Sequence, residues 1–127
     1  MCKICEEEPG SHSFVFYGKT NEGESIYYTC PADASKYWDT EGILNHYKEV
    51  LEQNNNNKWM WIFDCAGFGM KHYMEINTAL GIIEILSEYE NSLCEIQILN
   101  TNPLIKTLYL LIYQFLSRDM VNKIKWK

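Results

Sequence analysis

The second half of the chain alternates between short strand-like runs and longer segments with helical periodicity. Strands are predicted at residues 59–63, 96–100 and 123–126, and helices at residues 73–90 and from Pro103 to about residue 116. The run at 59–63 is continuously apolar, which is typical of a strand covered on both faces. Strands that alternate with helices pair in parallel through right-handed crossovers. The sequence therefore predicts an α/β fold with a mainly parallel sheet.

Two further strand-like runs precede this alternation. Residues 13–17 and 25–30 flank a connector that is rich in turn-forming residues, which indicates a β-hairpin. Apolar residues then recur at helical spacing within residues 33–53, so an amphipathic helix is expected there. Either Asp39 or Thr40 is expected to cap the start of this helix.

Length, charge and cysteine content narrow the function classes. The 127 residues fit one domain, and we expect a loose lead-in at residues 1–11 followed by a single domain over residues 12–127. The formal net charge of −6 and the lack of a basic stripe argue against nucleic-acid partners. No apolar run approaches the roughly 20 residues that span a bilayer, and no signal peptide is recognised. Five cysteines in such a chain favour reduced thiols and a cytoplasmic location.

The helical segment 104–116 is unusually apolar. Its only polar residues are Lys106, Thr107 and Gln114, so apolar side chains cover nearly every face of the helix. A surface helix normally has one polar face. This helix is therefore expected to be fully buried, to pack against a second copy of the chain, or to lie against lipid.

An ordered set of motifs in the chain points to a known family. The matching features are, in chain order, the apolar strand Trp59–Phe63, the turn Asp64-Cys65-Ala66-Gly67, the helix 73–90, Ile98-Leu99-Asn100 with Pro103, the helix that ends in Phe115-Leu116, and Lys123-Ile124. The set resembles the CRAL-TRIO (Sec14-like) lipid-binding family, whose opening hairpin is similar to residues 18–28. The resemblance implies a three-layer α/β/α CRAL-TRIO-like domain with a mainly parallel sheet and an N-terminal β-hairpin.

The resemblance also implies a function. Family members bind a hydrophobic small molecule or a phospholipid in an apolar pocket and exchange it during transient membrane contact. In this chain the pocket would be gated by helix 103–117, and the protein would be cytoplasmic with peripheral attachment to membranes. Strand alternation places Trp59, Trp61 and Phe63 on one face, toward the pocket. With the residues implied by the resemblance, the expected lipid-binding set is Trp59, Trp61, Phe63, Ile98, Asn100, Leu104, Leu108, Leu111, Ile112 and Phe115.

Departures from the family pattern support an alternative function. Trp59 and Trp61 stand where phosphatidylinositol-binding members carry small hydroxyl residues, so they remove hydroxyl donors and would narrow the pocket. The chain is also short for the family at both ends. The alternative is a BCH-like protein-interaction scaffold of the same fold with a reduced or filled pocket, which engages small GTPases or forms a homodimer.

No pattern of catalytic residues or metal ligands is complete in the sequence. Asp64 is interpreted as fixing a turn rather than as an acid or base, and no nucleophile or phosphate-loop motif accompanies it, so we expect no enzyme and no cofactor. Cys2 and Cys5 with His12 supply only three of the four ligands of a structural zinc site, and His46 is expected to be a partly exposed helix residue. The sequence therefore predicts no metal site.

Overall fold

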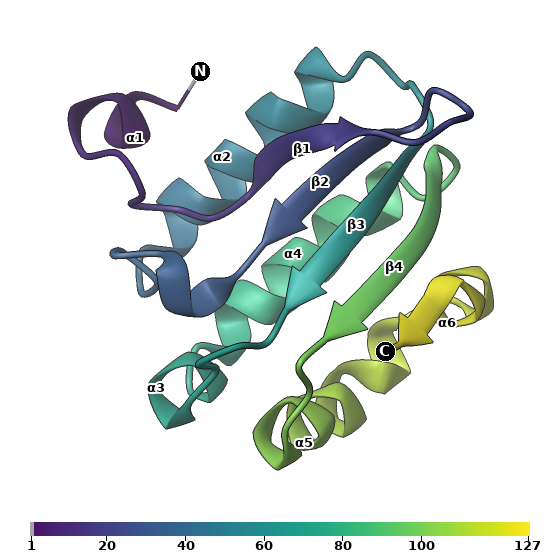
Figure 1. Ribbon diagram of the computed structural model, residues 1–127. Coiled ribbons are helices and arrows are strands. Elements are labelled where there is room, and N and C mark those ends of the chain that lie inside the picture. Colours follow the sequence, from purple (N-terminus) through teal and green to yellow (C-terminus); the bar gives the residue numbers. More distant parts are fainter. Residues whose placement is uncertain (1) are drawn as a thin grey trace.

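The computed structural model describes residues 2–127 and is built around a five-stranded sheet (Figure 1). The strands lie side by side in chain order: β1 (Val15–Lys19), β2 (Ser25–Thr29), β3 (Trp59–Asp64), β4 (Leu93–Leu99) and β5 (Ile124–Trp126). β1 pairs with β2 in antiparallel orientation, and β2 to β5 are all parallel. The α/β class, the mainly parallel sheet and the N-terminal hairpin are thus confirmed.

All the helices except α1, which precedes β1, lie in the connections between successive parallel strands. The longer ones are α2 (Thr40–Gln53), α4 (Ile76–Glu88) and α5 (Pro103–Ile112), and the shorter ones are α1 (Lys3–Glu7), α3 (Met70–Tyr73) and α6 (Arg118–Lys123). Two 3-10 turns add η1 (Pro31–Asp33) and η2 (Tyr113–Phe115). Asp39, one of the two residues expected to cap α2, is its N-cap. Its carboxylate accepts a hydrogen bond from the Gly42 amide at 3.2 Å.

One face of the sheet carries the hydrophobic core. Four helices, α2, α4, α5 and α6, contribute buried side chains to the same core as Trp61 of β3; examples are Tyr47, Leu86, Leu108 and Met120. The opposite face of the sheet carries half-buried side chains such as Ile62 and Gln97. Right-handed crossovers between strands laid down in chain order place successive helices on the same face. The four helices therefore form one layer over this face of the sheet, which differs from the two helical layers of the three-layer arrangement that the resemblance implies.

Residues 2–11 are hydrogen-bonded to the domain, unlike the loose lead-in expected for residues 1–11, of which residue 1 lies outside the described part of the chain. They contain helix α1, and Ser11 is fully buried. The Ser11 hydroxyl donates to the Glu8 carbonyl oxygen at 2.6 Å, and the Gly10 carbonyl oxygen accepts from the Ser35 amide at 3.0 Å. These bonds satisfy backbone polar groups that a loose tail would leave to water.

The expectation that His46 is partly exposed is wrong. Only 7% of this residue is accessible to solvent, because it lies on the side of α2 that faces the N-terminal segment. One ring nitrogen, Nε2, lies 2.8 Å from the backbone carbonyl oxygen of Phe14. Burial is the main cause that lowers the pKa of this imidazole below its ordinary value.

Candidate functional site

An apolar cavity of about 180 Å³ lies between the sheet and the helices that cover it. Its floor is formed by core-facing residues of β2 to β5, most of them toward the carboxyl ends of the strands, and its walls come from α2 to α6. The floor residues are Thr29, Trp61, Phe63, Ile96, Ile98, Ile124 and Trp126. Ligands of open α/β folds commonly bind at the carboxyl ends of the strands. The cavity is thus the candidate ligand site.

The polar atoms in the floor of the cavity are paired with one another. The Trp61 indole N–H donates to the Thr29 hydroxyl at 2.9 Å, and the hydroxyls of Thr29 and Tyr47 lie 3.1 Å apart. Complete burial raises the pKa of Tyr47, so its hydroxyl stays neutral. Because these groups satisfy each other, the floor presents an essentially apolar surface to a ligand.

His72 gives the wall of the cavity a polar group. Its Nδ1 accepts a hydrogen bond from the Gly69 amide at 3.0 Å, which places the proton of the neutral ring on Nε2. Burial, with a smaller contribution from Lys71, lowers the pKa of His72 below its ordinary value. The ring packs near Phe68, with centroids 5.5 Å apart, and lines the cavity as a neutral N–H donor.

Helix α5 covers the cavity and is apolar on both its inner and its outer face. Ile105, Leu108 and Ile112 face inward and line the cavity. On the outside, Leu110 is 75% exposed and Leu111 is 43% exposed. The fully buried alternative for this segment is therefore wrong. Its apolar character has two causes, a cavity on one side and an open apolar surface on the other.

The start of α5 is fixed by two bonds from one side chain. The side-chain oxygen Oδ1 of Asn102 accepts a hydrogen bond from the Ile105 backbone amide at 3.0 Å. Its side-chain nitrogen Nδ2 donates to the backbone carbonyl oxygen of Phe68 at 3.0 Å. Pro103 at the first helical position completes a strong start signal. No helix within residues 2–127 is long and apolar enough to cross a membrane.

The predicted site residues divide into two groups. Half of them line the cavity: Trp61, Phe63, Ile98, Leu108 and Ile112. The other half lie elsewhere: Trp59, Asn100, Leu104, Leu111 and Phe115.

The second group has individual reasons for its placement. Trp59 is fully buried in the core, where its indole N–H donates to the Ser92 hydroxyl at 3.0 Å. Leu104 is partly buried against the core, and Leu111 and Phe115 lie on the outer surface. Asn100 adopts a left-handed backbone conformation, with φ of 53°, in the turn after β4.

Asp64 organises the turn at the end of β3, as the sequence predicts. Its carboxylate accepts from the Ala66 amide at 2.9 Å, from the Asn100 side chain at 2.8 Å and from the Tyr28 hydroxyl at 2.7 Å. Partial burial raises the pKa of Asp64, but the three hydrogen bonds together outweigh it and lower the pKa below its ordinary value. Asp64 is thus a structural acceptor rather than a proton donor near neutral pH.

Several cavity residues were not predicted from the sequence. Most come from helix faces: Ile43 and Tyr47 of α2, Thr78, Ala79, Ile82, Ile83 and Leu86 of α4, and Ile105 and Tyr109 of α5. Their spacing of three and four residues marks the inward stripe of a helix. That signal identifies core-facing positions, but it does not separate cavity wall from filled core.

The fold and the cavity define a class of structure, an α/β domain with an apolar cavity under a covering helix. The CRAL/TRIO domain family matches residues 13–127, and this chain belongs to that family. It is thus a lipid-binding domain in general terms, and members of the family are in general binding and transfer proteins rather than enzymes.

A solved structure supports the fold. The structure described as "Crystal structure of Sfh5" superposes with a TM-score of 0.72 at 15% sequence identity. The match covers 95% of this chain and 50% of that one, so the chain spans about half the length of that protein. A search of curated proteins finds no match.

Proposed function

We propose that this domain binds a hydrophobic small molecule or a lipid tail in the cavity, and that α5 is the gate through which the ligand exchanges with a membrane. The observation that carries the proposal is the combination of an apolar cavity under α5 with an exposed apolar surface on the same helix. Opening α5 at a membrane would expose the cavity to acyl chains while the outer leucines stay out of water.

The size of the cavity limits the ligand. Its volume of about 180 Å³ is below the roughly 300–1,000 Å³ of pockets that enclose drug-sized ligands. The closed form therefore suits a single acyl segment or a compact hydrophobe. An entire phospholipid requires α5 to move outward. The His72 N–H would donate to an oxygen at the polar end of such a ligand.

The direct test is to look for the ligand. Purified protein is expected to release a hydrophobic molecule on organic extraction, detected by mass spectrometry. After that extraction, the protein is expected to take up a fluorescent fatty acid from vesicles at a stoichiometry of one. An absence of both co-purifying lipid and uptake would contradict the proposed function.

Membrane contact through α5 is tested by changing its outer face. Leu110→Asp is expected to weaken binding to neutral phospholipid vesicles by about tenfold or more, because a buried leucine contributes roughly 1.5–3 kcal/mol. The measurement is vesicle co-sedimentation, with rates of ligand transfer between vesicles as a second readout. Gln114→Asp is the matched control, since Gln114 is already polar and exposed on the same segment.

The same experiment distinguishes the scaffold alternative. If Leu110→Asp leaves vesicle binding unchanged but abolishes a protein–protein or dimer contact, the outer face of α5 serves a protein partner. That result would contradict membrane contact, whereas the extraction experiment would still decide whether the cavity holds a ligand.

A further inference from the structure

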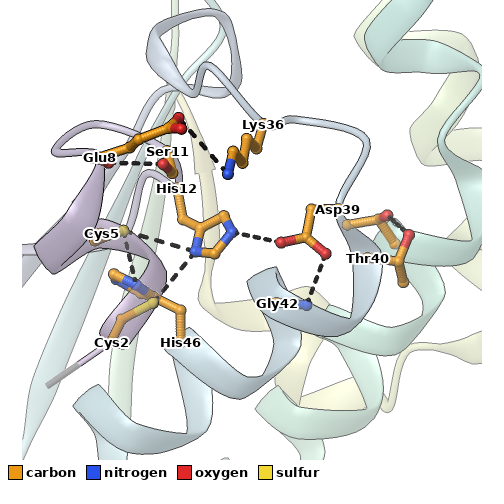
Figure 2. A network of polar contacts seen from close by, with 11 residues as sticks. Cys2, Cys5, Glu8, Ser11, His12, Lys36, Asp39, Thr40, Gly42 and His46 are labelled. Atoms are coloured by element: carbon orange, nitrogen blue, oxygen red, sulfur yellow. Dashed lines mark hydrogen bonds and ion pairs between the residues drawn. The ribbon is translucent and has the colours of Figure 1, made fainter.

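Four metal-ligating side chains meet where the N-terminal segment packs against α2 (Figure 2). They form the cysteine–histidine cluster: Cys2, Cys5, His12 and His46. Their sulfur and ring nitrogen atoms all lie within 4.8 Å of one another. Three of the residues are buried, and Cys5 is partly buried. The cluster is separate from the apolar cavity, which none of the four residues lines.

The spacing within the cluster fits a tetrahedral metal. The Nδ1 atom of His12 lies 3.5 Å from the Cys2 sulfur and 3.6 Å from the Cys5 sulfur, and Nδ1 of His46 lies 3.6 Å from the Cys5 sulfur. Zinc bound at about 2.3 Å from sulfur and about 2.0–2.1 Å from nitrogen sets tetrahedral sulfur-to-nitrogen separations of about 3.5 Å. These three sulfur-to-nitrogen distances therefore already match those around a tetrahedral zinc ion, and all four ligand atoms lie within 4.8 Å of one another.

The orientation of the His46 ring prepares it for a metal. Its Nε2 lies 2.8 Å from the Phe14 carbonyl oxygen, which can only accept a hydrogen bond. The proton of the neutral ring must therefore be on Nε2. The Nδ1 atom consequently presents a lone pair to the centre of the cluster, which is the form in which imidazole binds metals.

His12 is oriented in the same sense by a carboxylate. Its Nε2 lies 3.0 Å from Oδ2 of Asp39, while the other carboxylate oxygen accepts from the Gly42 amide at the start of α2. A histidine ligand whose outer nitrogen donates to a carboxylate is a recurrent arrangement at protein zinc sites. Asp39 thus links the cap of α2 to the orientation of a ligand, as Figure 2 shows.

The residue types in the cluster favour a bound zinc ion over a disulfide or an alkaline-earth ion. A disulfide between the two cysteines would remove both thiol protons and leave the two inward Nδ1 atoms without a donor. Two sulfurs and two imidazoles in a closed tetrahedron match zinc better than calcium or magnesium, which prefer oxygen ligands. A set of four protein ligands also leaves no open position, which is typical of structural rather than catalytic zinc.

We propose that the cysteine–histidine cluster binds one zinc ion, which fastens the N-terminal segment of residues 2–12 to helix α2. The bound ion requires both thiols as thiolates, so binding releases two protons. The site adds a structural role that is independent of a lipid in the cavity.

The test uses the whole chain purified under reducing conditions. We expect one equivalent of zinc by elemental mass spectrometry. Replacing zinc with cobalt(II) is expected to give the intense visible absorption of a tetrahedral site together with thiolate charge-transfer bands. A strong chelator is expected to lower the Tm by roughly 10 °C or more, because metal binding and folding are coupled.

Variants separate a metal site from a merely packed cluster. Cys5→Ser, which changes the least buried ligand, is expected to weaken zinc binding by more than about 100-fold, while Cys94→Ser, outside the cluster, leaves it unchanged. Asp39→Asn retains a good helix cap but alters the partner of His12. It is expected to weaken zinc binding by about 10–100-fold without changing the Tm of the metal-free protein.

Three results would overturn the proposal. The first is reduced, folded wild-type protein that holds neither zinc nor cobalt. The second is a Cys2–Cys5 disulfide, detected by mass and by the failure of a thiol reagent to label these two cysteines, in protein prepared without oxidant. The third is zinc affinity that is equal in Cys5→Ser and Cys94→Ser. Circular dichroism of each variant confirms that the comparison is made on folded protein.

Discussion

Ala79→Trp is expected to reduce uptake of a hydrophobic ligand by more than about tenfold. Ala79 lies on the inner face of α4 and lines the cavity, so an indole at this position would occupy the space that a ligand needs. The cavity is small, at about 180 Å³, and an added indole would fill much of it. Titration with a fluorescent fatty acid measures the loss, and each 1.4 kcal/mol of lost binding free energy gives about a tenfold weaker affinity.

The control for this variant is the same substitution on the surface. Ala66 lies in the exposed turn after β3, so Ala66→Trp adds an indole without filling the cavity. Overpacking at Ala79 is expected to cost about 1–3 kcal/mol of stability, which urea denaturation measures separately. Undiminished uptake by folded Ala79→Trp protein would show that the ligand does not enter this cavity.

The order of the elements was predictable because it rests on local signals. The alternating runs from Trp59 onward carry their own periodicity, and parallel pairing follows from the connections between them. The turn at Asp64 was also predictable, because a carboxylate after a strand commonly accepts from the next backbone amides. These features depend on residues that are close in sequence.

The boundary of the cavity was less predictable because it depends on what fills the space. Strand alternation correctly places Trp59 and Trp61 on the same face of β3. However, the rings of Phe14 and Tyr27 both pack edge-on to Trp59, with centroids 6.2 Å and 5.8 Å from that of its indole, and the core is closed at this position. Trp61 is the next residue on the same face of β3, two positions along the chain, and it lines the cavity. No residue pattern in β3 distinguishes the two positions.

The cysteine–histidine cluster was missed for a related reason. Cys2, Cys5 and His12 are near one another in sequence, but the fourth ligand, His46, comes from α2. Zinc motifs are recognised when their ligands occur as two closely spaced pairs. A ligand set completed by tertiary packing lacks that signature, and only the approach of α1 to α2 brings it together.

Trp59→Ala is expected to lower the free energy of unfolding by about 3–5 kcal/mol, the usual cost of removing a large aromatic side chain from a core. Trp59 is fully buried, packs edge-on to Phe14 and Tyr27, and donates to the Ser92 hydroxyl. The truncation would leave a cavity and remove the hydrogen bond that the Ser92 hydroxyl accepts, although this hydroxyl would still donate to the Tyr89 carbonyl oxygen. Urea denaturation followed by circular dichroism measures the effect.

Trp38→Ala is the matched control, because Trp38 is 56% exposed and its loss is expected to change stability by no more than about 0.5 kcal/mol. Measuring ligand affinity then shows whether Trp59 belongs to the filled core or to the wall of the cavity. Trp59→Ala should bind the fluorescent fatty acid within about twofold of wild type under conditions where it is folded, since a factor of two in affinity is only about 0.4 kcal/mol. A loss of affinity as large as that of Ala79→Trp, with little change in stability, would place the ligand at the Trp59 end of β3 and contradict the assigned cavity.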